Sequence, residues 1–139
     1  NIKDFFLGYR KTKLKKGEFI KSIKIPLPSS NIFKAYKVSK RFDDDISSVC
    51  GSFNLNFKNN IIKEIKIAYG GMSSKPKRAL ICENFLKNKE FSKDNIILAF
   101  NKLEKDYQPI DDMRASKEYR IEIAKNLLFK FYLEVIDSR

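Results

Sequence analysis

Apolar and polar residues alternate along the front half of the chain with a period close to two, the spacing of a β-strand that has one buried face. In the first such segment, Phe19, Ile23 and Ile25 stand among lysine and serine, and Pro26 ends the pattern. The segments that show this alternation are 18–26, 31–39, 48–58 and 61–71. We therefore predict that these four segments are strands.

Two short connections join these segments. Asn59 and Asn60 separate the third from the fourth, and asparagine tolerates the positive φ angles that a tight hairpin turn requires. The four-residue run "LPSS" links the first segment to the second. Because polar residues occupy one side of each segment, we expect an antiparallel sheet with one face toward solvent.

The back half of the chain changes to a period near 3.6, which is typical of amphipathic helices. Pro76 stands where a helix that extends to about Leu86 begins. Ser92 is placed to cap a second helix, and Ser116 begins the approximate capping box "SKEY" of a third. Apolar residues in the second helix recur at i, i+3, i+4 and i+7, namely Ile96, Ala99, Phe100 and Leu103.

These elements predict an α+β fold, with a three- to four-stranded antiparallel sheet covered on one face by about three helices. We interpret residues 1–139 as a single domain, strand-rich over 17–72 and helical over 73–139. The N-terminal run "DFFLGYRKTKL" fits neither period. It is too apolar for a tail and too short for a domain, so we expect the chain to be part of something larger.

The absence of histidine limits the chemistry that the chain could carry out. It excludes Ser-His-Asp and Cys-His nucleophiles and any zinc site with histidine ligands. The two cysteines, Cys50 and Cys82, cannot complete a structural zinc site. We therefore predict no catalytic and no metal-ligating residue. Widely spaced cysteines without a signal peptide indicate a cytoplasmic protein, and the apolar runs are too short to span a membrane.

The formal net charge of +12 raises the possibility of nucleic-acid binding. However, the lysines are spread along the chain, interleaved with acids, and they alternate with apolar residues in "IIKEIKI". Neither an Arg-rich arm nor an RNP motif is present. The pattern favours a lysine-rich solvated surface over polyanion binding. Nucleic acid is thus an unfavoured partner, and a basic nucleic-acid-binding module remains an alternative function.

The stretch "KRFDDDI", residues 40–46, concentrates three carboxylates in this basic chain. It could be a metal site, a solvated turn or the rim of a cofactor pocket. A calcium loop is disfavoured because the required glycine and the spacing of oxygen ligands are absent. In a solvated turn, Asp43 or Asp45 would cap the following segment through its side chain.

Four runs, in order, resemble the C-terminal part of the FAD domain of xanthine dehydrogenase, a molybdenum hydroxylase. They are "FFLGYRKTKLKKGEFIKSIKIP", "FKAYKVSKRFDDDIS", "IAYGGM" and "DDMRASKEYRIEIAKNLLFKFYLE". The resemblance also extends to the C-terminal domain of CO dehydrogenase flavoproteins. It covers nearly the whole chain, and the segment 81–107 contributes little to it.

The resemblance implies that this chain is part of a xanthine dehydrogenase-like oxidoreductase and is inactive alone. In that family a molybdenum centre oxidises substrate, iron–sulfur clusters relay electrons, and FAD passes them to NAD or oxygen. It also implies FAD held partly by an upstream subdomain, with 2Fe–2S clusters and molybdopterin elsewhere in the complex and NAD as the expected acceptor. The implied partners are the upstream FAD-binding subdomain, an iron–sulfur domain and a molybdopterin-binding subunit, together a hetero-oligomer.

The resemblance assigns two cofactor-binding residues and a flavin-adjacent loop. Ile20 falls where the family has an apolar residue against the flavin, and Lys37 matches a lysine among its FAD contacts. Arg41 and Asp44 match the basic and acidic members of the loop beside the ring. Phe42 departs from the animal enzymes, which have a second arginine there. The alternatives are that Ile20 packs on a neighbouring strand and Lys37 is a solvated lysine.

Other prominent residues are expected to be structural. Arginines near helix ends and sheet edges commonly tie carbonyls and carboxylates together. We therefore assign the Tyr9-Arg10 pair, Arg114 and the Tyr119-Arg120 pair to domain packing or subunit contact. The aromatic run of Phe129, Phe131 and Tyr132 is expected to belong to the core. A docking or assembly domain without flavin contact is the remaining alternative function.

Overall fold

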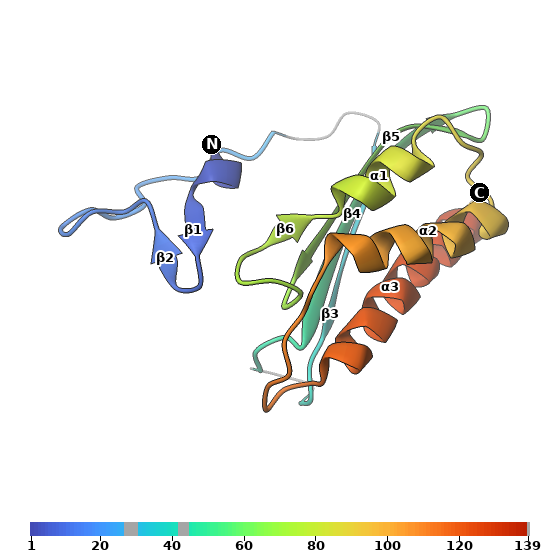
Figure 1. Cartoon of the computed structure of the whole chain (residues 1–139). Helices are drawn as coiled ribbons and strands as arrows, with labels where there is room; N and C mark the ends of the chain where they lie inside the picture. The colour runs from blue at the N-terminus through green and yellow to red at the C-terminus, as the bar shows by residue number, and fades with distance from the viewer. Residues whose placement is uncertain (27–30, 42–44, 139) are drawn as a thin grey trace.

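The computed structural model describes residues 1–26, 31–41 and 45–138 (Figure 1). A two-stranded hairpin with a short 3-10 helix comes first, and a four-stranded sheet with three helices follows. The first group comprises η1 (Ile2–Asp4), β1 (Phe6–Gly8) and β2 (Lys11–Thr12). The second comprises β3 (Ile32–Val38), β4 (Val49–Lys58), β5 (Ile61–Gly70), β6 (Lys77–Arg78), α1 (Leu80–Leu86), α2 (Lys93–Asp106) and α3 (Lys117–Asp137).

The larger sheet has the strand order β3-β4-β5-β6, and each neighbouring pair is antiparallel. The helices cover one face of it (Figure 1). Asn59 and Asn60 turn β4 into β5 with φ angles of 51° and 61°, which confirms the predicted hairpin. The predicted α+β fold is therefore confirmed, as are three of the four predicted strands.

The prediction of a strand over 18–26 is wrong. This segment forms no strand, and Phe19, Ile23 and Ile25 are 80%, 69% and 75% exposed. Alternation identifies a face that could be buried, but a strand also needs a neighbour for its backbone groups. The described chain supplies no such neighbour for 18–26. The fourth strand of the sheet is the two-residue β6.

The start of the first helix is also later than predicted. Instead of entering a helix after Pro76, the chain pairs β6 with β5, and the Ala79 N–H donates to the Ile67 carbonyl at 2.8 Å. These contacts with a distant strand hold the backbone extended up to α1. The other two helix starts are confirmed, because Ser92 and Ser116 accept hydrogen bonds from backbone N–H groups in the first turns of α2 and α3.

The core lies between the sheet and the helices. Phe53 of β4 is fully buried; its ring stacks on Phe131 of α3 at 5.0 Å and meets the edge of Tyr69 at 5.7 Å. Gly51 lies beside it, since a Cβ there would be 2.9 Å from the Tyr69 ring. Phe129 and Tyr132 are partly buried against this cluster, which confirms that the aromatic run belongs to the core.

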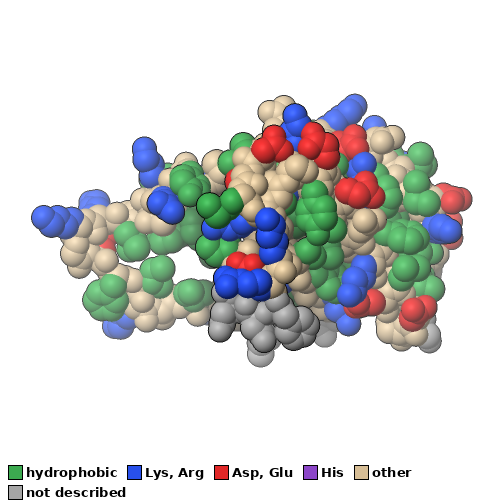
Figure 2. All heavy atoms as spheres, turned by 90° about the horizontal axis from the view of Figure 1, so that it is seen from below, with side chains coloured by type: hydrophobic (Ala, Val, Ile, Leu, Met, Phe, Trp, Pro, Cys, Tyr) green, Lys and Arg blue, Asp and Glu red, His purple; other side chains and the backbone are tan. Residues whose placement is uncertain are grey.

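The N-terminal hairpin projects from the sheet-and-helix body (Figure 1). Not one residue of 1–26 is buried, and the Lys75 ammonium donates to the Phe6 carbonyl at 3.2 Å. Figure 2 shows apolar side chains exposed along this projecting segment, with lysine and arginine among acidic and apolar groups on the body. Among the described helices, none combines the length and the apolar character that crossing a membrane would require.

Candidate functional site

Within the described residues, no helix or strand covers the face of the sheet opposite the three helices. Since antiparallel partners point to the same side, the register of β3, β4 and β5 identifies the side chains on this face. All are exposed or only partly buried, and many are small. They are Phe33, Ala35, Lys37, Cys50, Ser52, Asn54, Asn56, Glu64, Lys66, Ala68 and Gly70, with Arg78 on β6.

Lys37 lies on this uncovered face, in the edge strand β3. It pairs with Cys50 of β4, which in turn pairs with Gly70 of β5. A Cβ at Gly70 would have only the Cys50 Cβ within 4 Å, at 3.9 Å, and the backbone of Gly70 is not left-handed. The described chain therefore gives no steric reason for a glycine there. In this row, Lys37 is therefore followed by two small residues on the exposed side of the sheet.

The connection from β3 to β4 is tied across its ends by Asp45. Its carboxylate accepts from the Arg41 backbone N–H at 3.1 Å and lies 3.7 Å from the Arg41 guanidinium. The Arg41 N–H is the main cause that lowers the pKa of Asp45, and the charges of Arg41 and Lys37 add to it. The Ile46 N–H also donates to Asp45 Oδ1 at 2.9 Å, so the alternative in which the Asp45 side chain bonds the segment that follows is confirmed. Phe42, Asp43 and Asp44 lie outside the described residues.

Ile20 is not part of this uncovered face. It lies in a segment without strand pairing, and its side chain is 52% exposed. It belongs to no strand of the larger sheet. Of the residues predicted around the flavin, Lys37 and Arg41 both lie near enough to Asp45 for their charges to lower its pKa. Ile20 lies on a separate segment.

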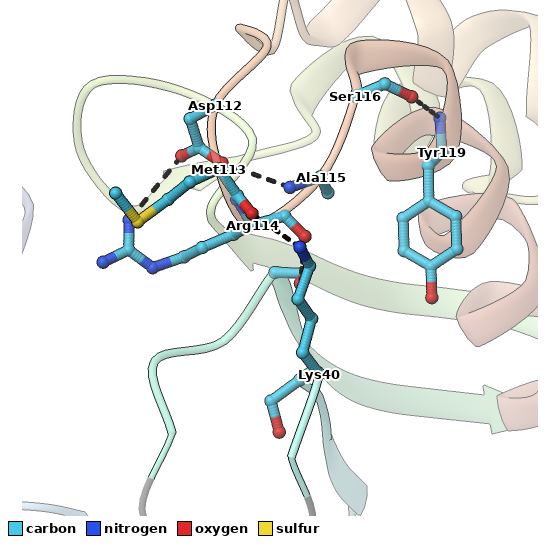
Figure 3. Close-up of a pocket in the computed structure, with 9 residues that line it drawn as sticks. Lys40, Asp112, Met113, Arg114, Ala115, Ser116 and Tyr119 are labelled. Atoms are coloured by element: carbon cyan, nitrogen blue, oxygen red, sulfur yellow. Dashed lines mark hydrogen bonds and ion pairs between the residues drawn. The ribbon is translucent and has the colours of Figure 1, made fainter.

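A cavity of about 480 Å³ lies between the β3–β4 connection and the turn that precedes α3 (Figure 3). The Lys40 ammonium reaches across it and donates to the Met113 carbonyl at 2.6 Å. Asp112 shapes the turn, because its Oδ1 accepts from the backbone N–H groups of Arg114 at 2.8 Å and Ala115 at 3.2 Å. These N–H groups and Arg120 lower the pKa of Asp112, with the Arg114 N–H as the largest cause.

Arg120 joins this turn to the end of the sheet. Its side chain is buried, and Nη1 donates to the carbonyls of Ser48 at 2.5 Å and Gly71 at 2.8 Å. Nη2 donates to Asp112 Oδ1 at 2.6 Å. The structural role expected for this arginine is confirmed. Gly71 has a φ of +80°, and a Cβ there would lie 2.3 Å from the Ser48 carbonyl oxygen, so its glycine is required.

The sequence did not single out Ser48 or Asp112 as partners of Arg120. Serine and aspartate are common in loops, and only the Gly70-Gly71 pair hinted at a close backbone approach here. Among the described residues, no group of three or more cysteine, aspartate and glutamate side chains is arranged to hold a metal ion.

Residues 34–135 match the family described as the CO dehydrogenase flavoprotein C-terminal domain. The chain belongs to this family. The match confirms the resemblance to the C-terminal part of the xanthine dehydrogenase FAD domain, to which this flavoprotein C-terminal domain is homologous. It covers β3 to α3, and so includes Lys37, Arg41 and the Asp112–Arg120 pair.

Two curated relatives illustrate the extent of the similarity. The glyceraldehyde dehydrogenase medium chain of Sulfolobus acidocaldarius is 33% identical over 132 residues, which are 95% of this chain and 47% of that protein. Xanthine dehydrogenase of Oryza sativa subsp. japonica is 32% identical over 139 residues, which are 96% of this chain and 10% of that protein. This chain thus spans about half the length of the medium chain and a tenth of that of the larger enzyme.

Solved structures share the same fold. Quinoline 2-oxidoreductase from Pseudomonas putida 86 superposes with a TM-score of 0.83 over 94% of this chain and 45% of that one, at 22% identity. A carbon monoxide dehydrogenase from Hydrogenophaga pseudoflava gives a TM-score of 0.81 over 91% and 44%, at 21% identity.

Proposed function

We propose that this chain forms one wall of the FAD site in the flavoprotein part of a xanthine dehydrogenase-like molybdenum hydroxylase. The observation that carries the proposal is the uncovered sheet face, where Lys37 stands beside the small residues Cys50 and Gly70. A Cβ at Gly70 would project into space that the chain leaves open, which suits the close approach of a planar ring. The described residues therefore fit a flavin.

Lys37 has a chemical role in this proposal. FAD supplies the electron-transfer chemistry when it is bound, and the protein orients it and adjusts its charge. Reduced flavin carries negative charge near its pyrimidine edge. An ammonium already positioned there stabilises that charge without reorganisation.

The N-terminal segment would face the upstream FAD-binding subdomain. Its apolar side chains are exposed in the described chain, and burial stabilises by about 25 cal/mol for each Å² of apolar surface removed from water. Ile20 would contribute an apolar contact to the flavin or to that subdomain. The apolar residues of this segment that are at least half exposed are Ile2, Leu7, Tyr9, Phe19, Ile20, Ile23 and Ile25.

The β3–β4 connection would influence the electron acceptor, NAD or oxygen. The Arg41 side chain is 76% exposed and is anchored at its backbone by Asp45. A guanidinium near the ring favours extra negative charge on the flavin, and a carboxylate such as that of Asp44 opposes it. Electrons would reach FAD from iron–sulfur clusters, with molybdopterin on another domain or subunit of the same hetero-oligomer.

The test is the FAD affinity and visible spectrum of the complete flavoprotein that contains this chain. We expect Lys37→Met to weaken FAD binding about ten- to a hundredfold, because a charge-assisted contact is worth about 1.5–3 kcal/mol. Lys34→Met is the matched control, since Lys34 carries the same charge on the same strand but pairs with Phe53 on the helix-covered side.

Ile20→Ala, tested in the same assay, probes the apolar contact. A flavin spectrum with a loss confined to Lys37→Met and Ile20→Ala supports the proposal. Unchanged flavin content in both variants would favour a docking or assembly domain without flavin contact. A complete protein that neither contains nor takes up FAD would contradict the flavin-wall function outright.

A further inference from the structure

Both described ends of the β3–β4 connection are held by the turn that precedes α3. On the incoming side, the Lys40 ammonium donates to the Met113 carbonyl at 2.6 Å. On the outgoing side, the Ser48 hydroxyl donates to the Arg114 carbonyl at 3.3 Å. The Ser48 N–H also closes the connection by donating to Val38 at 2.8 Å. The connection therefore rests on the 112–116 turn as well as on its own strands.

Arg120 holds the outgoing end in place. Burying a guanidinium is costly unless hydrogen bonds compensate it, and the Nη1 and Nη2 donors of Arg120 reach three separate segments: the start of β4, the residue after β5 and the pre-α3 turn. Within the described part of the chain, Nε has no hydrogen-bond partner. An apolar side chain at position 120 would avoid the cost of desolvating a charge. However, it could not hydrogen-bond to both the Ser48 carbonyl and the Asp112 carboxylate, as Arg120 does.

Asp112 is the carboxylate partner of Arg120 in the pre-α3 turn. One carboxylate oxygen accepts from Arg120 and from two backbone N–H groups of the turn, and these contacts lower the pKa of Asp112 and keep it ionised at neutral pH. The same residue thus sets the shape of the turn that receives Lys40 and orients the arginine that holds Ser48.

We propose that Asp112 and Arg120 are positioning residues for the β3–β4 connection and, through it, for the surroundings of the flavin. The inference rests on the proposed function, because that function places the connection beside FAD. Neither residue needs to touch the cofactor. Their effect is to fix where Arg41 and the end of β3 stand.

The first experiment measures the connection itself in the complete flavoprotein. Trypsin cleavage after Lys40 or Arg41, both exposed, is followed by mass spectrometry, with cleavage after Lys58 at the far end of β4 as internal reference. We expect Asp112→Asn to accelerate cleavage at the connection about tenfold, since it weakens charge-assisted hydrogen bonds and proteolysis follows the open population. Cleavage after Lys58 should not change.

Glu118→Gln is the matched control, because Glu118 is an exposed carboxylate in the first turn of α3 that forms an ion pair with its neighbour Lys117. Lys40→Gln is a second, milder variant that removes only the contact with Met113. It should also accelerate cleavage after Arg41. Equal cleavage rates in Asp112→Asn, Lys40→Gln and Glu118→Gln would overturn the proposal.

The second experiment measures the midpoint potential of the bound flavin in the same proteins. We expect a shift in Asp112→Asn that Glu118→Gln does not show, with the far-ultraviolet circular dichroism unchanged. Faster cleavage with an unaltered potential would overturn the link to the flavin. If the wild-type protein binds no FAD, the proposed function fails, and the proteolysis still decides whether the two residues hold the connection.

Discussion

At the scale of single residues, Gly51, Gly70 and Gly71 differ in how much space a Cβ would have. We expect Gly71→Ala to be the most destabilising change, because it combines a left-handed φ with a Cβ only 2.3 Å from the Ser48 carbonyl. Gly51→Ala should cost about 1–3 kcal/mol by overpacking against Tyr69 and its neighbours. Gly70→Ala should be neutral or stabilising by up to about 1 kcal/mol.

Urea unfolding of this chain measures all three changes. A marked loss of stability in Gly70→Ala would show that its glycine serves the fold rather than an approaching group. In the complete flavoprotein, the same alanine should weaken FAD binding despite leaving the fold intact, because its Cβ projects onto the surface proposed for the ring.

At the scale of elements, α1 depends on a carboxylate from another helix. Ala79 at its N-cap provides no side-chain cap, and Asp106 at the end of α2 accepts from the Ile81 and Cys82 N–H groups at 3.0 and 2.9 Å. We expect Asp106→Ala to cost about 1–3 kcal/mol, because it leaves these helix-start donors unsatisfied.

Urea unfolding is again the measurement, with Asp94→Ala as the control. Asp94 is an exposed acid in the first turn of α2, so its removal should cost no more than about 1 kcal/mol through the helix dipole. Equal losses in the two variants would mean that Asp106 contributes only its charge and not a cap.

At the scale of the whole molecule, the N-terminal segment contributes little to the core. Because 1–26 has no buried residue, a chain that begins at residue 31 should unfold within about 1 kcal/mol of the 139-residue chain. It should also self-associate less, since it lacks the exposed apolar side chains of the segment. Urea unfolding and sedimentation velocity check these two expectations, and a loss above about 2 kcal/mol would contradict the first.

The local parts of the fold could be predicted because their causes lie within a few residues. The turn at Asn59 and Asn60 depends on the φ angles that asparagine tolerates. The starts of α2 and α3 depend on a serine hydroxyl and a backbone N–H three residues later. By contrast, 18–26 carried a regular alternation and formed no strand, since pairing requires a neighbour that periodicity cannot specify.

In the candidate site, too, the local sequence predicts some features, and others depend on contacts between distant segments. Lys37 and Arg41 came from a family resemblance, and nothing in the local sequence distinguishes Lys37 from Lys34. The register of β3 against β4 separates them, because it puts one on the uncovered face and the other on the helix side. The partners of Arg120 were not predictable, since Ser48 and Gly71 lie 72 and 49 residues from it in sequence and only Asp112, at eight residues, is near.

The sequence by itself determined the α+β class, the hairpin and the caps of the longer helices, because hydrophobic period and turn chemistry act over short distances. Its four ordered motifs also indicated the family. Only the tertiary structure decided which face of the sheet stays open, that β6 completes it, that Asp106 caps α1, and that Asp112 and Arg120 hold the β3–β4 connection. These features depend on which distant segments meet, and that choice is made when the whole core packs.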